Sequence, residues 1–371
     1  MKFSCLQENL NWGLGIVGRA VSNHTVLPIA NNILFETDET RLKLVATNLG
    51  LAVSCWIEAK IEEEGTITVP AKIFTAFVES LPKEQITIDM LPRDHILTIR
   101  GGRHDARIAG LDSKDFPPIP SVDEGINIIV EIDALKKAIS QVLFAVSQED
   151  ARPVLTGVKI EISGKDLTLA AADGFRLAVY KMPLRSPVDG KTEVIVPGKT
   201  LDEFLKLASS QSGTVQITIS PSKHKVIFRL QNIELVSSLL DYHFPQYENL
   251  IPSISVTMAV VDSEECLRAI KAAHIFAQNM SSIVRLKISE GMMTISGKSE
   301  EVGENVGVID ATVKGPEAKI AFNGKYLIDV LSVLKGSKVA FEVNSPSSPG
   351  VIRVVGSASY VYVLMPMFVQ W

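Results

Sequence analysis

The chain has 371 residues, of which 46% are hydrophobic and 21% are charged, and its formal net charge is −5. This composition is typical of a globular protein, and the length suffices for about two to four domains. The longest uncharged stretch near the end, residues 357–371, is too short to span a membrane and is interrupted by Pro366. The acidic balance argues against a protein that grips nucleic acid with its outer surface, but it allows basic residues gathered on one concave face.

Cysteine and histidine usage argues against a metal centre. The three cysteines lie far apart and no Cys-x-x-Cys occurs, so neither a zinc site nor a disulfide framework is expected. The six histidines lack the spacing of metal ligands, and His274 is expected to be a satisfied core residue. We therefore expect no metal and no cofactor. Because the N-terminus also lacks a secretion signal, we expect a cytoplasmic protein.

An amphipathic helix is predicted three times along the chain, at intervals of roughly 125–131 residues. Each carries small or apolar residues at i, i+3, i+4, i+7, i+8 and i+11, a spacing that places them on one face. The three stripes are Leu10, Gly13, Leu14, Val17, Gly18 and Val21; Leu135, Ala138, Ile139, Val142, Leu143 and Val146; and Cys266, Ala269, Ile270, Ala273, His274 and Ala277. Recurrence at this interval predicts tandem copies of a whole domain.

A second helix is predicted in each copy, directly after a strand. The strands cover residues 66–70, 193–197 and 319–323, and they end in Pro, Pro and Asn, residue types suited to the start of a helix. Each of these helices has a lysine at its start, namely Lys72, Lys199 and Lys325.

Short runs with alternating hydrophobicity follow the second helices, for example residues 85–90, 214–219 and 225–230, and they predict half-buried strands. Proline-containing joints end the first two copies, at residues 116–120 and 244–252. We therefore predict an α+β fold of three tandem copies of one domain, 1–124, 125–252 and 253–371. Each copy has two helices on one side and antiparallel sheets on the other.

Such a chain could form part of a ring. Two chains would supply twelve helices, which at roughly 10 Å per helix would surround an opening of about 28 Å. A DNA duplex is roughly 20 Å wide and would fit within it.

Basic side chains on the predicted helices fit this arrangement, because they would contact phosphates without reading sequence. On the first helices of the three copies they are Arg19, Lys136, Lys137, Arg268 and Lys271, and the lysines that start the second helices join them. For any single residue an ordinary solvated helix face remains an alternative, but the threefold recurrence of the second-helix lysine favours a DNA-facing role.

Six segments, in this order and spacing, resemble the bacterial DNA polymerase III β subunit, the sliding-clamp family, over the whole chain. They are residues 25–34, 46–49, 152–157, 171–178, 244–247 and 360–367. The resemblance implies a DNA clamp fold and a head-to-tail homodimeric ring without catalytic activity. The ring would encircle duplex DNA as a processivity factor and tether the α subunit of the replicative polymerase, the clamp loader and other DNA-processing proteins.

The resemblance also implies a hydrophobic pocket that captures a short linear motif of these partners. Its residues would be Leu155, Ala172, Gly174, Phe175, Arg176, Leu177, Pro245, Leu250, Val363, Met365, Pro366 and Met367, bordered by Asn323 and Tyr326. Methionine and leucine suit such a pocket because they adapt to varied partners. Without the resemblance, Met365, Pro366 and Met367 would be interpreted as a final core strand.

Further contacts are implied by the same resemblance. Additional DNA contacts would come from His24, Gln148 and Arg152. Ring closure would pair the segment 103–109, including Arg103 and Ile108, with Ile275 and Phe276 of the other copy.

Several positions depart from the family pattern. Phe175 stands where histidine is frequent, Asn249 stands where a basic residue is common, and residues 367–371 read Met-Phe-Val-Gln-Trp in place of a Met-Arg-Leu ending. We therefore expect a less basic and more aromatic pocket rim. His24 replaces a frequent arginine, and Glu149 and Asp150 are unfavourable beside phosphate, so Arg152 is the preferred contact of its loop.

Two glycine-containing motifs resemble nucleotide-binding sites, but each is only a weak argument against a DNA clamp. Gly13-Leu-Gly-Ile-Val-Gly18 fits a dinucleotide fingerprint, but its helix would be too short for a crossover, and we interpret Gly13 and Gly18 as small residues of the buried stripe. Gly198-Lys199-Thr200 resembles the end of a phosphate loop, but its first glycine is replaced by Glu193. A nucleotide-dependent enzyme and a scaffold that binds only proteins remain the alternatives to a DNA clamp.

Overall fold

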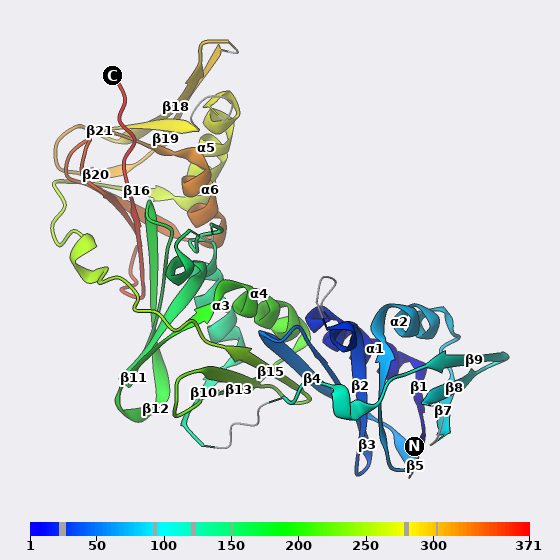
Figure 1. Ribbon diagram of the computed structural model, residues 1–371. Helices are drawn as coiled ribbons and strands as arrows, with labels where there is room; N and C mark the ends of the chain where they lie inside the picture. Colours follow the sequence, from blue (N-terminus) through cyan, green and yellow to red (C-terminus); the bar gives the residue numbers. More distant parts are fainter. Residues whose placement is uncertain (22–26, 92–94, 120–123, 150, 278–281, 302) are drawn as a thin grey trace. The chain divides into compact units, whose positions relative to one another are not determined.

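The computed structural model describes residues 1–21, 27–91, 95–119, 124–149, 151–277, 282–301 and 303–371 (Figure 1). The chain divides into two compact units, Met1–Asp133 with Asp202–Leu239, and Ala134–Leu201 with Leu240–Trp371. The division runs through the predicted second copy, because each unit contains a sheet to which two neighbouring copies contribute strands.

The first unit contains two complete helices and two antiparallel sheets. Its elements are β1 (Lys2–Leu6), α1 (Gln7–Val17), β2 (Asn32–Asp38), β3 (Arg41–Thr47), β4 (Leu51–Glu58), β5 (Lys60–Glu63), β6 (Thr66–Pro70), α2 (Ala71–Ser80), β7 (Gln85–Leu91), β8 (Ile96–Gly101), β9 (His104–Ala109), β10 (Ile126–Glu131), β13 (Thr214–Ile219), β14 (Lys225–Arg229) and β15 (Ile233–Ser238). The predicted order of strand, helix and three strands, twice over, holds for the first copy with β5 as an additional strand.

Two helices, α3 (Ile132–Leu143) and α4 (Gly198–Leu207), cross the division between the units. The second unit further contains β11 (Gly157–Ala172), β12 (Arg176–Pro197), β16 (Thr257–Asp262), α5 (Ser263–Ala277), β17 (Ile283–Ser289), β18 (Met292–Ser299), β19 (Gly303–Asp310), β20 (Thr312–Lys314), β21 (Ala318–Asn323), α6 (Gly324–Val333), β22 (Lys338–Val343), β23 (Gly350–Val354) and β24 (Tyr360–Leu364). Among the described residues, no helix is long and apolar enough to cross a membrane.

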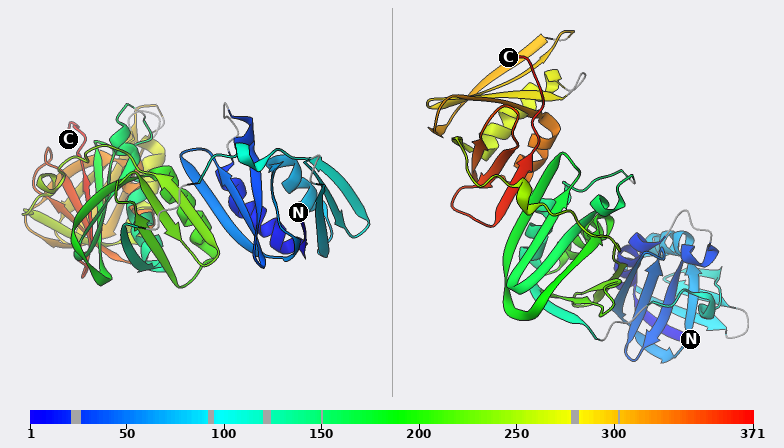
Figure 2. Two further views of the ribbon diagram at one scale, coloured as in Figure 1. Left: turned by 60° about the horizontal axis from the view of Figure 1, so that its bottom comes forward. Right: turned by 60° about the vertical axis from the view of Figure 1, so that its left-hand side comes forward.

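Strand pairing joins neighbouring copies within each unit. In the first unit β15 pairs with β4, with Ile233 opposite Cys55, and completes the sheet β10-β13-β14-β15-β4-β3-β2-β6. In the second unit β12, part of the long β11–β12 hairpin (green in Figure 2), pairs with β24 and completes the sheet β11-β12-β24-β23-β22-β16-β20. Continuous main-chain ladders therefore run across the predicted domain joints.

The smaller sheets leave two strands at their edges. The sheet β5-β1-β7-β8-β9 of the first unit has β5 and β9 at its edges, and the sheet β19-β18-β17-β21 of the second unit has β19 and β21 at its edges. Helix α5 packs against β17, β18 and β19, and α1 packs against β3 and β4. Helix α5 therefore covers the smaller sheet of the second unit, whereas α1 packs against the larger sheet of the first unit.

The helix stripes predicted from the sequence form most of the buried helix faces. In α1, Leu10, Leu14 and Val17 are fully buried, and a Cβ on Gly13 would lie 2.7 Å from Leu44 Cδ1. The prediction for Gly18 was wrong, because α1 ends at Val17 and Gly18 is exposed in a short 3-10 turn. Val146 likewise lies beyond the end of α3.

His274 also differs from the prediction. Its Nδ1 is buried and has no hydrogen-bond partner, so the side chain is not a satisfied core residue. Burial lowers the pKa of this imidazole, which favours the neutral form.

The two glycines of α1 that differ in surroundings provide a stability test. Gly15 has no neighbouring heavy atom within 4 Å of an added Cβ, whereas Gly13 has Leu44 and Ile57 at 2.7 and 3.0 Å. We expect Gly15→Ala to raise the free energy of unfolding by about 1 kcal/mol through helix propensity. Gly13→Ala should lower it by about 1–2 kcal/mol, because overpacking outweighs that gain. Urea unfolding measures both, and equal effects of the two substitutions would contradict the packing of α1.

Candidate functional site

A cavity of about 620 Å³, open to solvent, lies in the second unit. Its walls are almost wholly apolar and consist of Leu155, Ala172, Gly174, Phe175, Arg176, Leu177, Phe244, Pro245, Tyr247, Leu250, Pro349, Val363 and Met365. Ten of the fourteen residues expected at a partner pocket thus line one cavity. Phe244, Tyr247 and Pro349 were missed, although the segment 244–247 was among those that carried the resemblance.

Strand pairing brings the walls together. In the β12–β24 ladder Leu177 lies opposite Val363, and both side chains are buried in one cluster with Tyr247. The rim is formed by exposed apolar side chains, with Phe175 62%, Leu250 57% and Met365 47% accessible. Asn249 is also exposed but does not line the cavity. The cavity therefore has a floor of paired strands and an apolar rim, to which Phe175 alone of the positions that depart from the family pattern contributes.

The turn between β11 and β12 holds the rim residue Phe175. The Asp173 Oδ1 atom accepts hydrogen bonds from the backbone N–H groups of Phe175 and Arg176, at 2.9 and 3.1 Å. Gly174 adopts φ +97°, a conformation that favours glycine. The Phe175 carbonyl accepts a hydrogen bond from the Met365 N–H at 2.9 Å, which ties the turn to the segment after β24.

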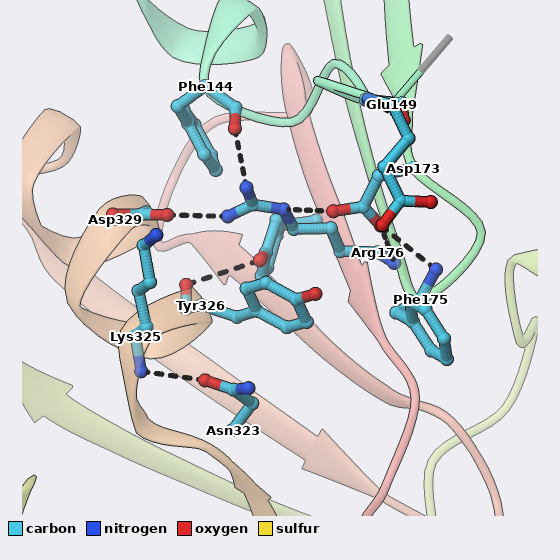
Figure 3. A network of polar contacts seen from close by, with 11 residues as sticks. Phe144, Glu149, Asp173, Phe175, Arg176, Asn323, Lys325, Tyr326 and Asp329 are labelled. Atoms are coloured by element: carbon cyan, nitrogen blue, oxygen red, sulfur yellow. Dashed lines mark hydrogen bonds and ion pairs between the residues drawn. The ribbon is translucent and has the colours of Figure 1, made fainter. Parts of the chain in front are cut away.

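Arg176 forms a buried ionic network behind this wall (Figure 3). Its Nε donates to Asp173 Oδ2 at 2.8 Å, its Nη1 to Asp329 Oδ2 at 2.6 Å, and its Nη2 to the Phe144 carbonyl at 2.7 Å. The side chain is only 8% accessible. Burial alone would lower the pKa of the guanidinium, but the hydrogen bond to Asp329 and the nearby carboxylates raise it overall.

Asn323 and Tyr326 lie on the other side of this network rather than among the lining residues. The Tyr326 ring lies 4.3 Å from the Arg176 guanidinium carbon, in cation–π contact, and the Tyr362 hydroxyl donates to the Tyr326 carbonyl at 3.2 Å. The Asn323 side chain accepts a hydrogen bond from the Lys325 N–H at 2.9 Å and caps α6 (Figure 3).

The C-terminal segment leaves the cavity earlier than expected. Met367 N–H donates to the Ala321 carbonyl at 2.7 Å, so the chain after Met365 follows β21. Pro366 and Met367 consequently do not line the cavity. Further along, Phe368 is 84% exposed and the Trp371 ring lies 5.8 Å from Lys319 Nζ.

A second compensated cation supports the floor. Lys159 Nζ lies 3.0 Å from Glu161 and 3.1 Å from Glu193, and 5.4 Å from the centre of the Tyr247 ring. Burial would lower the pKa of Lys159, but its hydrogen bonds to the two glutamates raise it overall. Burial also raises the pKa of Tyr247 to about 12, so the residue stays neutral and apolar toward the cavity.

The basic residues expected to contact DNA are mostly exposed. Each recurring lysine is the second residue of its helix, Lys72 in α2, Lys199 in α4 and Lys325 in α6, and all three are exposed. Exposed positions are also held by Lys137, Gln148, Arg152, Arg268 and Lys271, whereas Lys136 is half-buried.

Two of the expected DNA contacts require comment. Arg19 lies in the 3-10 turn after α1, with Nη1 3.9 Å from a Glu203 carboxylate oxygen, so part of its charge is offset. His24 lies outside the described residues.

The residues expected at a subunit interface lie on or beside the open strands. Ile108 is half-buried in β9, and Arg103 is exposed just before it. On α5, Ile275 is 61% exposed and Phe276 is half-buried. Val306 and Val308 on the edge strand β19 are both 59% exposed. Neither valine was among the residues predicted from the sequence, although their alternation in Gly303–Asp310 is the signal of a strand with one apolar face.

Neither nucleotide motif has the local structure that it would need. Gly13 and Gly15 lie inside α1, which begins directly after β1 at Gln7, so they do not form a phosphate-binding loop. Lys199 occupies the position that Lys72 and Lys325 occupy in the equivalent helices. Within the described part of the chain, no group of three or more His, Cys, Asp or Glu residues could hold a metal ion. The cysteines are buried, and burial raises the pKa of Cys5 and Cys55 to about 12.

Each of the three copies matches a different domain model of one protein family. Models of the N-terminal, central and C-terminal domains of the DNA polymerase III beta subunit match residues 1–120, 129–246 and 248–368. The chain is 30% identical over 378 residues to the beta sliding clamp of Bacillus subtilis and 29% identical over 387 residues to that of Synechocystis. In both cases 99% of each protein is covered.

Solved structures agree over the full length. The Bacillus subtilis sliding clamp superposes with a TM-score of 0.95 at 29% identity, and a Pseudomonas aeruginosa sliding clamp bound to griselimycin superposes with 0.94 at 28%. Each comparison covers 100% of both chains. The resemblance inferred from the sequence and the predicted clamp fold are therefore confirmed. The chain belongs to the DNA polymerase III β subunit family, the β sliding clamps, which are non-catalytic processivity factors of that polymerase.

Proposed function

We propose that two copies of this chain close head to tail into a ring around duplex DNA in the cytoplasm. We further propose that the apolar cavity captures short segments of the polymerase III α subunit, the clamp loader and other DNA-processing proteins. Each copy would contribute three domains, 1–124, 125–252 and 253–371. The observation that carries the proposal is the open cavity with its exposed apolar rim, because a monomer gains nothing from such a surface and a partner segment would cover it.

Ring closure is supported by the open strands. β9 and β19 are edge strands of separate sheets, and exposed edges readily pair with a second chain. Val306, Val308 and Ile275 are well exposed. Burial of these side chains against a second copy would stabilise a head-to-tail contact, which closes when the rotation between copies allows it.

DNA contact is supported by the placement of the recurring lysines. A cation near the positive N-terminal end of a helix is unfavourable, by about 0.3–1 kcal/mol. Lys72, Lys199 and Lys325 nevertheless occupy the second position of α2, α4 and α6. An anionic partner in front of these helix starts would be attracted by both the lysine and the helix N-terminus, and this attraction would offset their mutual repulsion. DNA phosphates provide such a partner.

Partner capture is supported by the chemistry of the cavity wall. Its one arginine is already paired with Asp173 and Asp329, so the lining offers mainly apolar contacts. An extended peptide satisfies its own backbone through water and a few main-chain contacts while its apolar side chains fill such a cavity. A scaffold that binds only proteins is the remaining alternative, and it would show no dependence on DNA topology.

The dimer interface can be tested with Phe276→Asp. A carboxylate at this half-buried position would be desolvated on closure, so we expect a monomer of 40.4 kDa where the original chain gives twice that mass in light scattering. Ile129→Asp, at an exposed apolar position on β10, is the matched control and should remain dimeric. A dimeric Phe276→Asp chain would contradict the proposed interface.

The DNA-facing lysines can be tested by combining Lys72→Glu, Lys199→Glu and Lys325→Glu. We expect the loaded ring to leave nicked circular DNA faster. The slope of log retention against log salt should decrease by about 0.9 for each lost phosphate contact. Lys165→Glu, at an exposed position in β11, controls for net charge. Retention on short linear DNA equal to that on circular DNA would exclude a topological ring.

The cavity can be tested with Phe175→Ala and Met365→Ala, two rim positions whose exposure limits the effect on folding. Loss of an apolar anchor at the centre of an interface costs about 2 kcal/mol or more, so we expect roughly 30-fold weaker binding of the α subunit by surface plasmon resonance. Phe368→Ala removes an exposed aromatic outside the cavity lining and should have little effect.

Griselimycin, the ligand named in the Pseudomonas aeruginosa complex, gives an independent measurement. We expect it to bind this chain; competition with the α subunit and weaker binding by Phe175→Ala would together place its site in the cavity. An effect of Phe368→Ala on α-subunit binding equal to that of Phe175→Ala would contradict the placement of the partner site in the cavity.

A further inference from the structure

We propose that Asp329 on helix α6 is a positioning residue for the partner-binding cavity. It does not line the cavity, but it acts through Arg176 on the turn that carries Phe175. The inference rests on the proposed function of the cavity, and it assigns to α6 a part in holding the shape of a wall formed by β11 and β12.

A continuous chain of hydrogen bonds links Asp329 to the rim (Figure 3). Asp329 accepts from Arg176 Nη1 at 2.6 Å, Arg176 Nε donates to Asp173 at 2.8 Å, and Asp173 accepts from the Phe175 N–H at 2.9 Å. Phe175 in turn accepts from the Met365 N–H. Two rim residues therefore depend on where the guanidinium is held.

Each acceptor in this chain has its own task, so Asp173 cannot replace Asp329. Asp173 Oδ1 is occupied by two backbone N–H groups of the turn, and Oδ2 is occupied by Arg176 Nε. The Phe144 carbonyl accepts from Nη2. Without Asp329, Nη1 would lose its charged acceptor, and the Arg176 side chain that carries it is only 8% accessible.

When Asp329 is removed, we expect the Arg176 guanidinium to move rather than to stay in place without an acceptor. A buried charge that loses one partner seeks water or another acceptor. Once Asp329 is removed, the nearest carboxylate to Arg176 is that of Asp173, at 2.8 Å. Competition for the Asp173 oxygens would weaken their bonds to the N–H groups of Phe175 and Arg176, and the turn would become looser.

The aromatic side chains around Arg176 explain why α6 is suited to this task. The guanidinium lies over Tyr326 at 4.3 Å and over Phe144 at 5.4 Å. Tyr326 and Asp329 are three residues apart on α6, so one helix face supplies both the ring and the carboxylate. The Tyr362 hydroxyl fixes the start of that face through the Tyr326 carbonyl. The side chain of Arg176 is thus restrained in direction by rings and in position by acceptors.

The test uses Asp329→Asn, which keeps the shape of the side chain, removes its charge and leaves Arg176 Nη1 only a neutral, weaker acceptor. We expect about tenfold weaker binding of the polymerase III α subunit to the full-length chain, mainly through faster dissociation, by a variant that remains folded but melts at a lower temperature. Amide hydrogen exchange at Phe175 and Arg176 should accelerate in the free protein. Asp329→Glu, which restores the carboxylate, should recover most of the affinity. Asp241→Asn, at an exposed aspartate of the same unit, is the matched control and should bind like the original chain.

Each outcome decides the proposal. Unchanged affinity and exchange in Asp329→Asn would overturn it, and so would a loss of affinity that merely accompanies global unfolding. If Asp329→Asn does not fold, Arg176→Lys keeps the charge but cannot reach three acceptors, and undiminished binding by that variant would overturn the proposal. Failure of the original chain to bind the α subunit would overturn the proposed function itself, whereas binding that Phe175→Ala weakens and Asp329→Asn does not would overturn only the role of Asp329.

Discussion

The antiparallel pairing of β12 with β24 is the interaction on which the candidate site depends. The ladder places Leu177 opposite Val363 and joins strands of the second and third copies in one sheet. Main-chain hydrogen bonds fix the register, and a slip by one residue would turn every cavity-facing side chain to the other face. The floor of the cavity is therefore specified by backbone pairing, whereas its rim is specified by the turn at Asp173 and by the segment after β24.

Charges around this apolar wall are compensated in a common way. Arg176 and Lys159 each lie between two carboxylates and against aromatic rings, so both cations remain ionised in surroundings that would otherwise favour neutral forms. Replacement of such a buried pair by apolar residues often costs no stability, which means that stability alone does not explain it. The hydrogen bonds of Arg176 instead have a positioning role, because they join the turn at Asp173 to helix α6 at Asp329.

The sequence contained the repeating plan but not the details that depend on tertiary pairing. The 3.6-residue periodicity located α1, α3 and α5, and the strand-to-helix junctions located Lys72, Lys199 and Lys325, because these signals are local. The exposure of Gly18, the turning of Pro366 and Met367 toward β21, and the role of Asp329 could not be found in this way. They follow from where a helix ends or from a partner that lies far away in the sequence.

The net charge of −5 opposes contact with DNA, whereas the recurring lysines favour it, so the placement of the lysines matters. At moderate salt, charges more than about 10 Å from the DNA are largely screened, so the local charges on the contacting face matter more than the net charge. Lysines at the second position of three helices concentrate positive potential where the backbone N–H groups already supply it. A small loss of helix stability, repeated in each copy, therefore allows a protein with excess negative charge to present cationic helix starts. In the proposed ring such contacts would hold phosphates without reading bases, which is the property required of a clamp that moves along DNA.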